Sequence, residues 1–292
     1  MDFDVIDICI KVQADDQERV SLLFPNLGSE FAACCRTVAC QTPDLSCEFC
    51  KKRGNCDWYF VFSQNCTEDS FALKRHQKPA LPFAFSFPWH DVGTGQKVKG
   101  VVEFRLTVIG RAINSLEMLL AGFSLLTESG LLTGCFVKEI CSRDLQGDIQ
   151  PLINGNLSLL SSSWIMEPCF NRNNHLEIIL SSPLKLLSGG KQTSSFDFAL
   201  FTRSVMRRVS SLAYYYGDYE FEADFTDLSR QVANVTCSEN SFELTGQNKL
   251  SGLVGSGTFM GDLEGIMPFL KLGAYLNVGK LSAFGMGNFK LA

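Results

Sequence analysis

Apolar positions along the first half of the chain change from a strand pattern to a helix pattern and back. A run of β-branched residues over 5–12 predicts a strand, and the stretch over 18–38 predicts a helix. Later elements follow in the order strand, strand, helix, strand, over 83–87, 98–108, 113–123 and 132–141. A segment rich in Pro and Gly separates the two middle strands and predicts a turn.

The same order of patterns starts again after residues 143–170, which are rich in Asn, Ser, Gly and Pro and are typical of a connector. The second half predicts a strand at 176–181, a helix capped by Ser195, strands near 219–225, 232–244 and 248–260, a helix that Asp262 caps and Gly273 ends, and a strand at 284–291.

This repetition predicts an α+β fold of two tandem ferredoxin-like domains. The first domain spans 1–145 and carries a Cys-rich insertion at about 40–80. A connector over 146–170 leads to the second domain, over 171–292.

Composition places the chain among folded proteins and gives an ambiguous signal about nucleic acids. The chain has 292 residues, of which 46% are apolar, and it has no apolar run long enough to span a membrane. Its start is acidic where a secretory signal is basic, so we expect a cytoplasmic protein with no membrane partner. A net charge of −5 argues against phosphate binding, but cations cluster at 51–53, 74–78, 97–99 and 203–208, which predicts a local basic face.

Four cysteines in the insertion have a spacing suited to a metal. They form the pattern Cys-x6-Cys-x2-Cys-x5-Cys at Cys40, Cys47, Cys50 and Cys56. The two-residue spacing in the middle lets one turn present two thiolates to one ion, which favours a structural zinc over an iron–sulfur cluster or four reduced thiols. Because four sulfurs would complete the coordination shell, we expect no catalytic metal.

The C-terminal loop combines glycines with one cation and one aromatic ring. Its candidate RNA-binding residues are Gly279, Lys280, Ser282, Phe284, Gly285 and Gly287. Backbone N–H groups without bulky side chains suit a phosphodiester, and an aromatic face suits a base. The alternative is a tight turn that needs glycine for its positive φ. Arg203 and Arg207, on the outer face of the predicted helix before this loop, are candidate phosphate contacts or a solvated face.

A duplicated ferredoxin-like chain that ends in Gly-Lys-x-Ser-x-Phe-Gly-x-Gly resembles the Cas6 family of CRISPR RAMP endoribonucleases. The resemblance is strongest over 245–292 and is supported over 175–216. It implies metal-independent cleavage of CRISPR repeat RNA, in which a ribose 2′-hydroxyl attacks the adjacent phosphate and leaves a cyclic phosphate. It also implies that the product RNA stays bound and that subunits of a CRISPR effector complex are possible partners.

The catalytic residue of many family members does not carry over. They place a histidine in or just after the first helix, whereas residues 18–40 contain none. His76, within the basic stretch 74–78, becomes the candidate proton shuttle, and Arg36 is the nearest cation in the usual region. The alternative for His76 is a solvated loop residue.

Two other functions stay open at this stage. The missing histidine and the acidic net charge favour a non-catalytic RNA-binding scaffold subunit of a CRISPR effector complex. The cysteines alone are also typical of a zinc-stabilised interaction domain unrelated to RNA.

Overall fold

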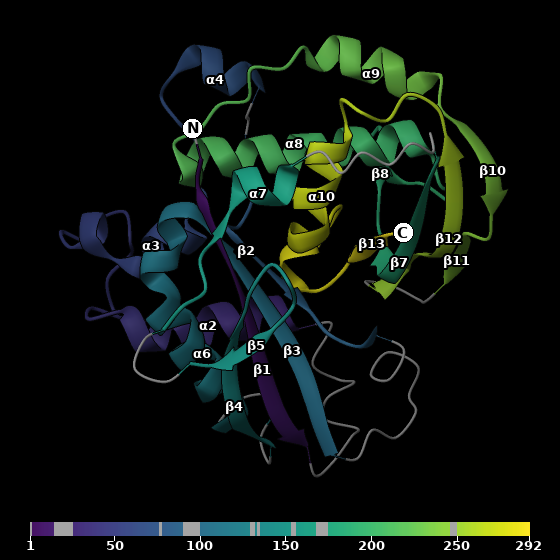
Figure 1. Cartoon of the computed structure of the whole chain (residues 1–292). Coiled ribbons are helices and arrows are strands. Elements are labelled where there is room, and N and C mark those ends of the chain that lie inside the picture. Colours follow the sequence, from purple (N-terminus) through teal and green to yellow (C-terminus); the bar gives the residue numbers. More distant parts are fainter. Residues whose placement is uncertain are drawn as a thin grey trace.

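The structure is a computed structural model in which two antiparallel sheets and their helices form two halves joined by a shared core (Figure 1). It describes residues 2–14, 26–75, 78–89, 100–128, 132, 135–152, 156–167, 175–245 and 250–292.

The first sheet has the topology of a ferredoxin-like domain. Its order is β2-β3-β1-β4-β5, with β1 (Asp4–Ala14) paired antiparallel to β3 (Gly100–Ile109) and β4 (Cys135–Arg143). β2 (Phe83–Ser86) and β5 (Ile149–Pro151) lie outside these strands. The helices between the strands are α2 (Leu27–Ala39), the 3-10 turn η2 (Gly110–Ser115) and α6 (Leu116–Glu128). The predicted order of strand, helix, two strands, helix and strand is confirmed.

The second sheet repeats this arrangement in the order β10-β12-β7-β13. β7 (His175–Leu184) lies between β12 (Gly252–Met260) and β13 (Phe289–Leu291), and β10 (Thr236–Asn240) and β11 (Glu243–Thr245) both pair with β12. The helices are α8 (Phe198–Gly217), α9 (Phe225–Ala233) and α10 (Met267–Leu276). The α+β fold of two tandem ferredoxin-like halves is therefore confirmed.

Two local predictions in the first part of this half are wrong. The predicted strand at 219–225 is irregular and leads into α9, because the Asp224 carboxylate accepts hydrogen bonds from the backbone N–H groups of Thr226 and Asp227 and starts a helix there. The cap of α8 is Asp197 rather than Ser195, since the Asp197 carboxylate accepts from the N–H of Leu200 at 2.9 Å.

The predicted ends of the last helix also differ from the structure. α10 starts at Met267, and Asp262 instead accepts a hydrogen bond from the N–H of Glu264 in the preceding turn. Gly273 lies inside α10 and does not end it. A Cβ at Gly273 would lie 2.5 Å from Cγ1 of Val205, so the glycine allows α10 to pack closely against α8.

Short elements fill the insertion and the connector. The insertion contains η1 (Arg53–Asn55), α3 (Asp57–Phe62) and α4 (Ser70–Arg75). β6 (Leu160–Ser161) pairs with β1, and α7 (Ser162–Met166) follows, so the end of the connector belongs to the first sheet. β8 (Leu187–Ser188) and β9 (Lys191–Gln192) form a small hairpin after β7. No helix in the described ranges is both long and apolar enough to cross a membrane.

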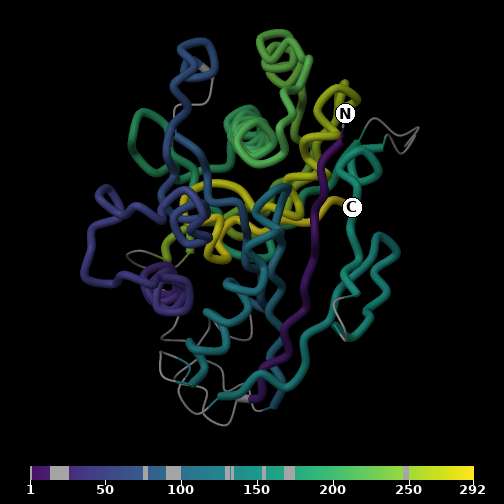
Figure 2. Tube along the Cα trace, turned by 90° about the vertical axis from the view of Figure 1, so that its left-hand side faces the viewer, coloured from purple at the N-terminus to yellow at the C-terminus, as the bar shows by residue number. Residues whose placement is uncertain are grey.

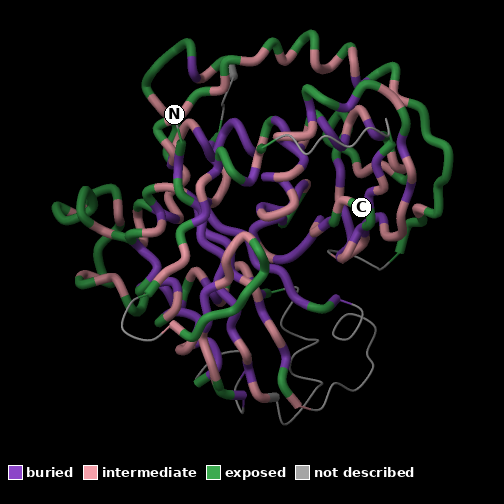
Figure 3. Tube along the Cα trace, viewed as in Figure 1, coloured by how far each residue is buried: buried purple, intermediate pink, exposed green. Residues whose placement is uncertain are grey.

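One apolar core runs through both halves (Figure 3). At the junction, Phe284 from the C-terminal loop packs against Phe83 of β2, with ring centroids 5.8 Å apart. Phe31 of α2 in turn packs against Phe83 and Phe85. The end of the chain therefore contributes to the core of the first half.

Candidate nucleic-acid interface

The C-terminal glycine loop, residues 277–288, is tightly packed between the two halves. Gly279, Gly285 and Gly287 all have positive φ. A Cβ at Gly287 would lie 1.8 Å from the carbonyl oxygen of Val278, and one at Gly285 would lie 2.2 Å from the Phe87 ring. These glycines are needed for close approach as well as for backbone conformation.

Several amides of this loop already have partners within the protein. The N–H groups of Lys280 and Gly287 donate to the carbonyls of Lys185 and Pro183, both at 2.9 Å, and that of Asn288 donates to Ser182 Oγ at 2.8 Å. The N–H of Phe284 donates to the carbonyl of Leu281. These four amides close the turn and are not free to bind a phosphate, while the binding of RNA by the loop stays a prediction.

Side chains of the loop are also mostly turned inward. Ser282 is only 5% exposed. The Phe284 ring packs directly against α2, where a Cβ added at Gly28 would lie 2.9 Å from it. Lys280 is exposed. Among the predicted loop contacts, the lysine is thus the one whose charged side chain reaches the surface.

Two asparagines hold this loop to the first half, and the sequence analysis missed them. Asn277 Nδ2 donates to the carbonyls of Phe85 and Ser282, at 2.7 and 2.9 Å. Asn288 Nδ2 donates to Asn277 Oδ1 at 2.9 Å and to Ser86 Oγ at 3.1 Å. Their positions at the two ends of a glycine-rich turn were the available signal, since asparagine commonly bonds to turn backbone.

A cavity of about 430 Å³, called here the basic pocket, opens beside the loop. Its lining residues are Lys78, Ala80, Lys185, Leu186, Leu187, Ser204, Arg207, Arg208, Ser211, Gly279, Lys280 and Ser282. Five of them are cations and none is acidic. The cations come from four separate segments, so the fold concentrates positive charge on a chain whose net charge is −5.

Two polar groups in the wall of the basic pocket are only partly satisfied. The Arg208 guanidinium donates through Nε to the carbonyl of Leu276 at 2.9 Å and through Nη2 to that of Phe83 at 3.3 Å. Burial lowers the pKa of Arg208 to about 10, because no carboxylate in the described part of the chain pairs with it. Ser211 Oγ is buried and has no hydrogen-bond partner there. An anion in the pocket would compensate the unpaired charge of Arg208.

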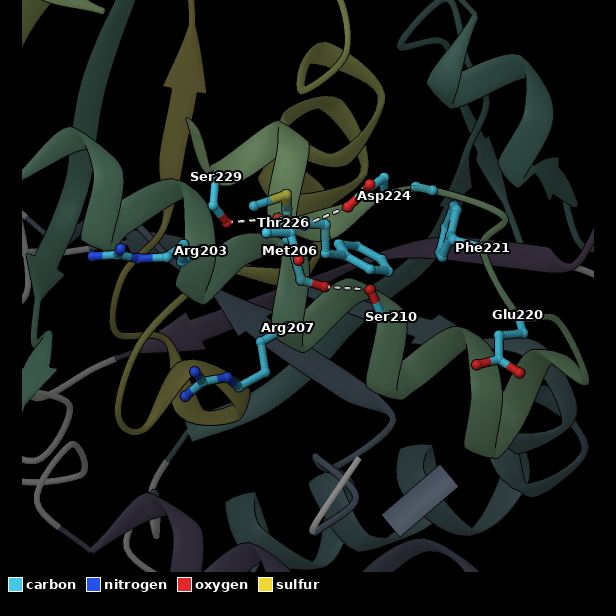
Figure 4. Close-up of a pocket in the computed structure, with 11 residues that line it drawn as sticks. Arg203, Met206, Arg207, Ser210, Glu220, Phe221, Asp224, Thr226 and Ser229 are labelled. Atoms are coloured by element: carbon cyan, nitrogen blue, oxygen red, sulfur yellow. Dashed lines mark hydrogen bonds between the residues drawn. The ribbon is translucent and has the colours of Figure 1, made fainter. Parts of the chain in front are cut away.

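A second cavity, of about 570 Å³, lies between α8 and the segment that leads into α9 (Figure 4). Arg203 and Arg207 line it from α8, and Arg207 also lines the basic pocket. Figure 4 shows both guanidinium groups directed away from Glu220. Neither arginine forms an ion pair or side-chain hydrogen bond with the described residues, so both charges are available to a ligand.

Histidines do not line the basic pocket within the described part of the chain. The catalytic candidate His76 lies outside the described residues, two positions before Lys78 in the sequence. His175 starts β7, ten residues before Lys185, which corresponds to about 33 Å along an extended strand. His175 is therefore too far from the pocket to transfer protons there.

Arg36, the other catalytic candidate, supports the insertion. Its guanidinium carbon lies 5.4 Å from the centre of the Trp58 ring, and Nη2 donates to the carbonyl of Pro43 at 3.4 Å. It does not line the basic pocket.

The four candidate zinc ligands all lie between the end of α2 and the start of α3. Cys40 follows α2, Cys56 precedes α3, and Cys47 and Cys50 lie in the turns between them. A hydrogen bond with Thr42 lowers the pKa of the Cys50 thiol. In the described segments, no three His, Cys, Asp or Glu side chains are grouped closely enough to hold a metal ion, and the zinc site stays a prediction.

The model of the CRISPR-associated endoribonuclease Cas6 family matches residues 178–289, which contain α8, the glycine loop and four of the five pocket cations. The chain therefore contains a Cas6 family domain over residues 178–289. A second family model, described as an N-terminal domain, matches residues 27–162. The search of curated proteins finds no match.

Solved structures share the Cas6 fold over the whole chain. A Cas6 product complex has a TM-score of 0.60 at 14% identity and covers 99% of this chain and 99% of its own. Cas6 of Thermus thermophilus has a TM-score of 0.56 at 13% identity, with 99% of each chain covered. A partial Cas6-RT-Cas1–Cas2 complex reaches a TM-score of 0.60 at 11% identity, covering 99% of this chain and 46% of that one. At such identities the likeness concerns the fold.

Proposed function

We propose that this protein is an endoribonuclease that cleaves CRISPR repeat RNA, with the basic pocket as its phosphate-binding site. The observation that carries the proposal is the pocket itself, where five cations from four segments meet and no lining residue is acidic. Phosphate affinity rises with the number of neutralising cations, and this concentration overcomes the acidic net charge of the chain. A related Cas6 structure is that of a product complex.

The proposed reaction needs no metal. A ribose 2′-hydroxyl attacks the adjacent phosphorus, its proton passes to a base, and the bond from phosphorus to the 5′-oxygen breaks. The departing oxygen takes a proton, so the products are a 2′,3′-cyclic phosphate and a 5′-hydroxyl. Negative charge increases on the phosphate oxygens in the transition state, and cations fixed beforehand stabilise it without rearrangement.

Roles for this chain's residues follow from their places around the pocket. Lys280 and Arg207 reach the surface at its rim and are proposed to contact the phosphate. Arg208 is held by two backbone carbonyls and is proposed to keep the pocket positive. His76 is the proposed proton carrier, because it is the histidine closest in sequence to a pocket residue.

Product retention follows from the same contacts. The cleaved repeat keeps nearly all of its phosphates, so the cations that bind the substrate also bind the product. We therefore propose that the processed RNA stays bound and is passed on in that state to partner subunits.

Single-turnover cleavage of the cognate repeat RNA in the presence of chelator tests the activity. We expect one cut that leaves a cyclic phosphate, and a reduction of two to four orders of magnitude in the rate for His76→Ala. His175→Ala is the matched control and should cleave normally, because His175 lies far from the pocket.

Binding without cleavage would support the second candidate function, a non-catalytic RNA-binding scaffold. That candidate is favoured by one observation, the absence of histidine from the described lining of the basic pocket. A lack of any specific binding to repeat RNA, compared with a scrambled RNA, would rule out both functions.

A further inference from the structure

The insertion presents an aromatic side chain and a lysine together on the surface, close in sequence to the basic pocket. Phe71 on α4 is 77% exposed, and Lys74 Nζ lies 5.4 Å from the centre of its ring. A phenylalanine so exposed contributes little to the core, and one isolated case would need no explanation. Here the cation and the ring form a pair, which we call the α4 platform.

Hydrogen bonds at both ends fix the segment that carries the α4 platform. Gln64 Nε2 donates to the carbonyl of Pro79 at 2.7 Å and closes the segment at its base. The N–H of Thr67 donates to the Tyr215 hydroxyl of α8 at 3.2 Å. The N–H of Phe71 donates to the Asp69 carboxylate at 2.8 Å, which starts α4. The segment just before α4 is therefore bonded to the helix that also carries the arginines of the basic pocket.

The position of α4 leaves its outer face open. Figures 1 and 2 show that α4 projects from the same side of α8 as α9, at the periphery of the molecule. Lys78, which lines the basic pocket, follows Lys74 by four residues, so their Cα atoms are at most about 14 Å apart. A strand bound in the pocket can reach the α4 platform within a few nucleotides.

We propose that the α4 platform binds single-stranded RNA that flanks the cleavage site, with one base stacked on the Phe71 ring and a phosphate beside Lys74. Stacking on an aromatic ring tolerates any base, and the lysine adds attraction to the backbone. This inference rests on the proposed function of the basic pocket and adds a second contact point to it. The pairing of the ring with a cation favours RNA over an apolar protein surface as the occupant.

Fluorescence anisotropy with two repeat RNAs tests the platform, one ending at the cleavage site and one extended by several unpaired nucleotides on each side. We expect Phe71→Ala to weaken binding of the extended RNA by about five- to 150-fold, and Phe71→Trp to restore it. The short RNA should bind equally well to both variants. Phe136→Ala is the matched control, because Phe136 is 54% exposed on β4.

Photocrosslinking gives a readout that a merely structural role would not change. Extended RNA carrying 4-thiouridine in the flank should crosslink to the peptide that contains Phe71, and mass spectrometry identifies that peptide. If Phe71→Ala binds both RNAs like the parent while Lys280→Ala binds both more weakly, the platform is refuted and the proposed function stands. If the parent protein does not bind repeat RNA, both are refuted.

Discussion

Replacing Gly287 by alanine tests whether the glycine loop is structural, as its packing indicates. The new Cβ would lie 1.8 Å from the carbonyl oxygen of Val278, at a residue whose φ is +68°. A left-handed conformation costs an alanine roughly 1–2 kcal/mol. The clash also separates Gly287 from Pro183 and Val278, with which it exchanges two backbone hydrogen bonds. Each bond contributes about 0.5–1.5 kcal/mol, so the free energy of unfolding should fall by about 2–5 kcal/mol in total.

Gly189→Ala is the matched control for this substitution. Gly189 has a φ of +57°, and a Cβ there would meet nothing within 4 Å, so only the conformational cost of about 1–2 kcal/mol applies. Both replacements restrict the unfolded chain equally, and the difference between them therefore reports the contacts at Gly287.

Differential scanning calorimetry measures this difference. For 292 residues, 1 kcal/mol corresponds to a change of about 1.5 °C in Tm. We expect Gly287→Ala to lower Tm by about 3–8 °C, and Gly189→Ala to lower it by about 2–3 °C. Equal Tm values for the two variants would refute the packing argument. Loss of RNA binding by Gly287→Ala at an unchanged Tm would instead support the amide clamp that the sequence suggested.

Three further predictions concern charge, acid stability and metal content. Lys280→Ala should weaken RNA binding and reduce the slope of log affinity against log salt concentration by about 0.7. The control Lys290→Ala, on β13, should change neither quantity. Equal slopes in salt titrations of the two variants would contradict the role of the basic pocket. Partial burial raises the pKa of Asp2, but hydrogen bonds from Ser161, Ser162 and Ser163 outweigh this effect and lower the pKa to about 2. The ionised Asp2 carboxylate should therefore stabilise the fold above pH 4, and this stabilisation should disappear as the pH falls through 2. We expect a small Tm difference between Asp2→Asn and the parent that vanishes over this range. A difference that persists at pH 1.5 would contradict the prediction. If Cys40, Cys47, Cys50 and Cys56 bind zinc, elemental analysis should find one zinc per chain. The zinc should be lost in Cys47→Ser and kept in the control Cys66→Ser. A metal-free parent protein would show that the four cysteines are reduced thiols.

The duplicated fold was predictable from the sequence, because strands and helices leave periodic patterns of apolar residues. The run over 5–12 became β1, and the stripe that contains Val205 and Val209 became the buried face of α8. Element ends were predicted less well. Both Asp197 and Asp224 cap helices, but so many polar residues precede each helix that the sequence does not single out the one whose side chain reaches the free amides.

The candidate site shows the limit of sequence reasoning more clearly. The basic clusters near Lys78 and Arg207 were visible in the sequence, but their meeting with Lys185 and Lys280 depends on contacts between distant segments. The glycine loop was recognised, but the close backbone contacts of its glycines were not, because a glycine that admits a ligand and a glycine that admits another backbone look alike in a sequence.

The sequence by itself determined the order of the elements, the Cas6 resemblance and the residue types available for RNA chemistry. These properties depend on local periodicity and on motifs read along the chain. Only the tertiary structure decided that Asn277 and Asn288 bond the loop to the first half, and that five cations share one cavity. The reason is that amide partners and charge density depend on distances between segments far apart in the chain, which no local pattern records.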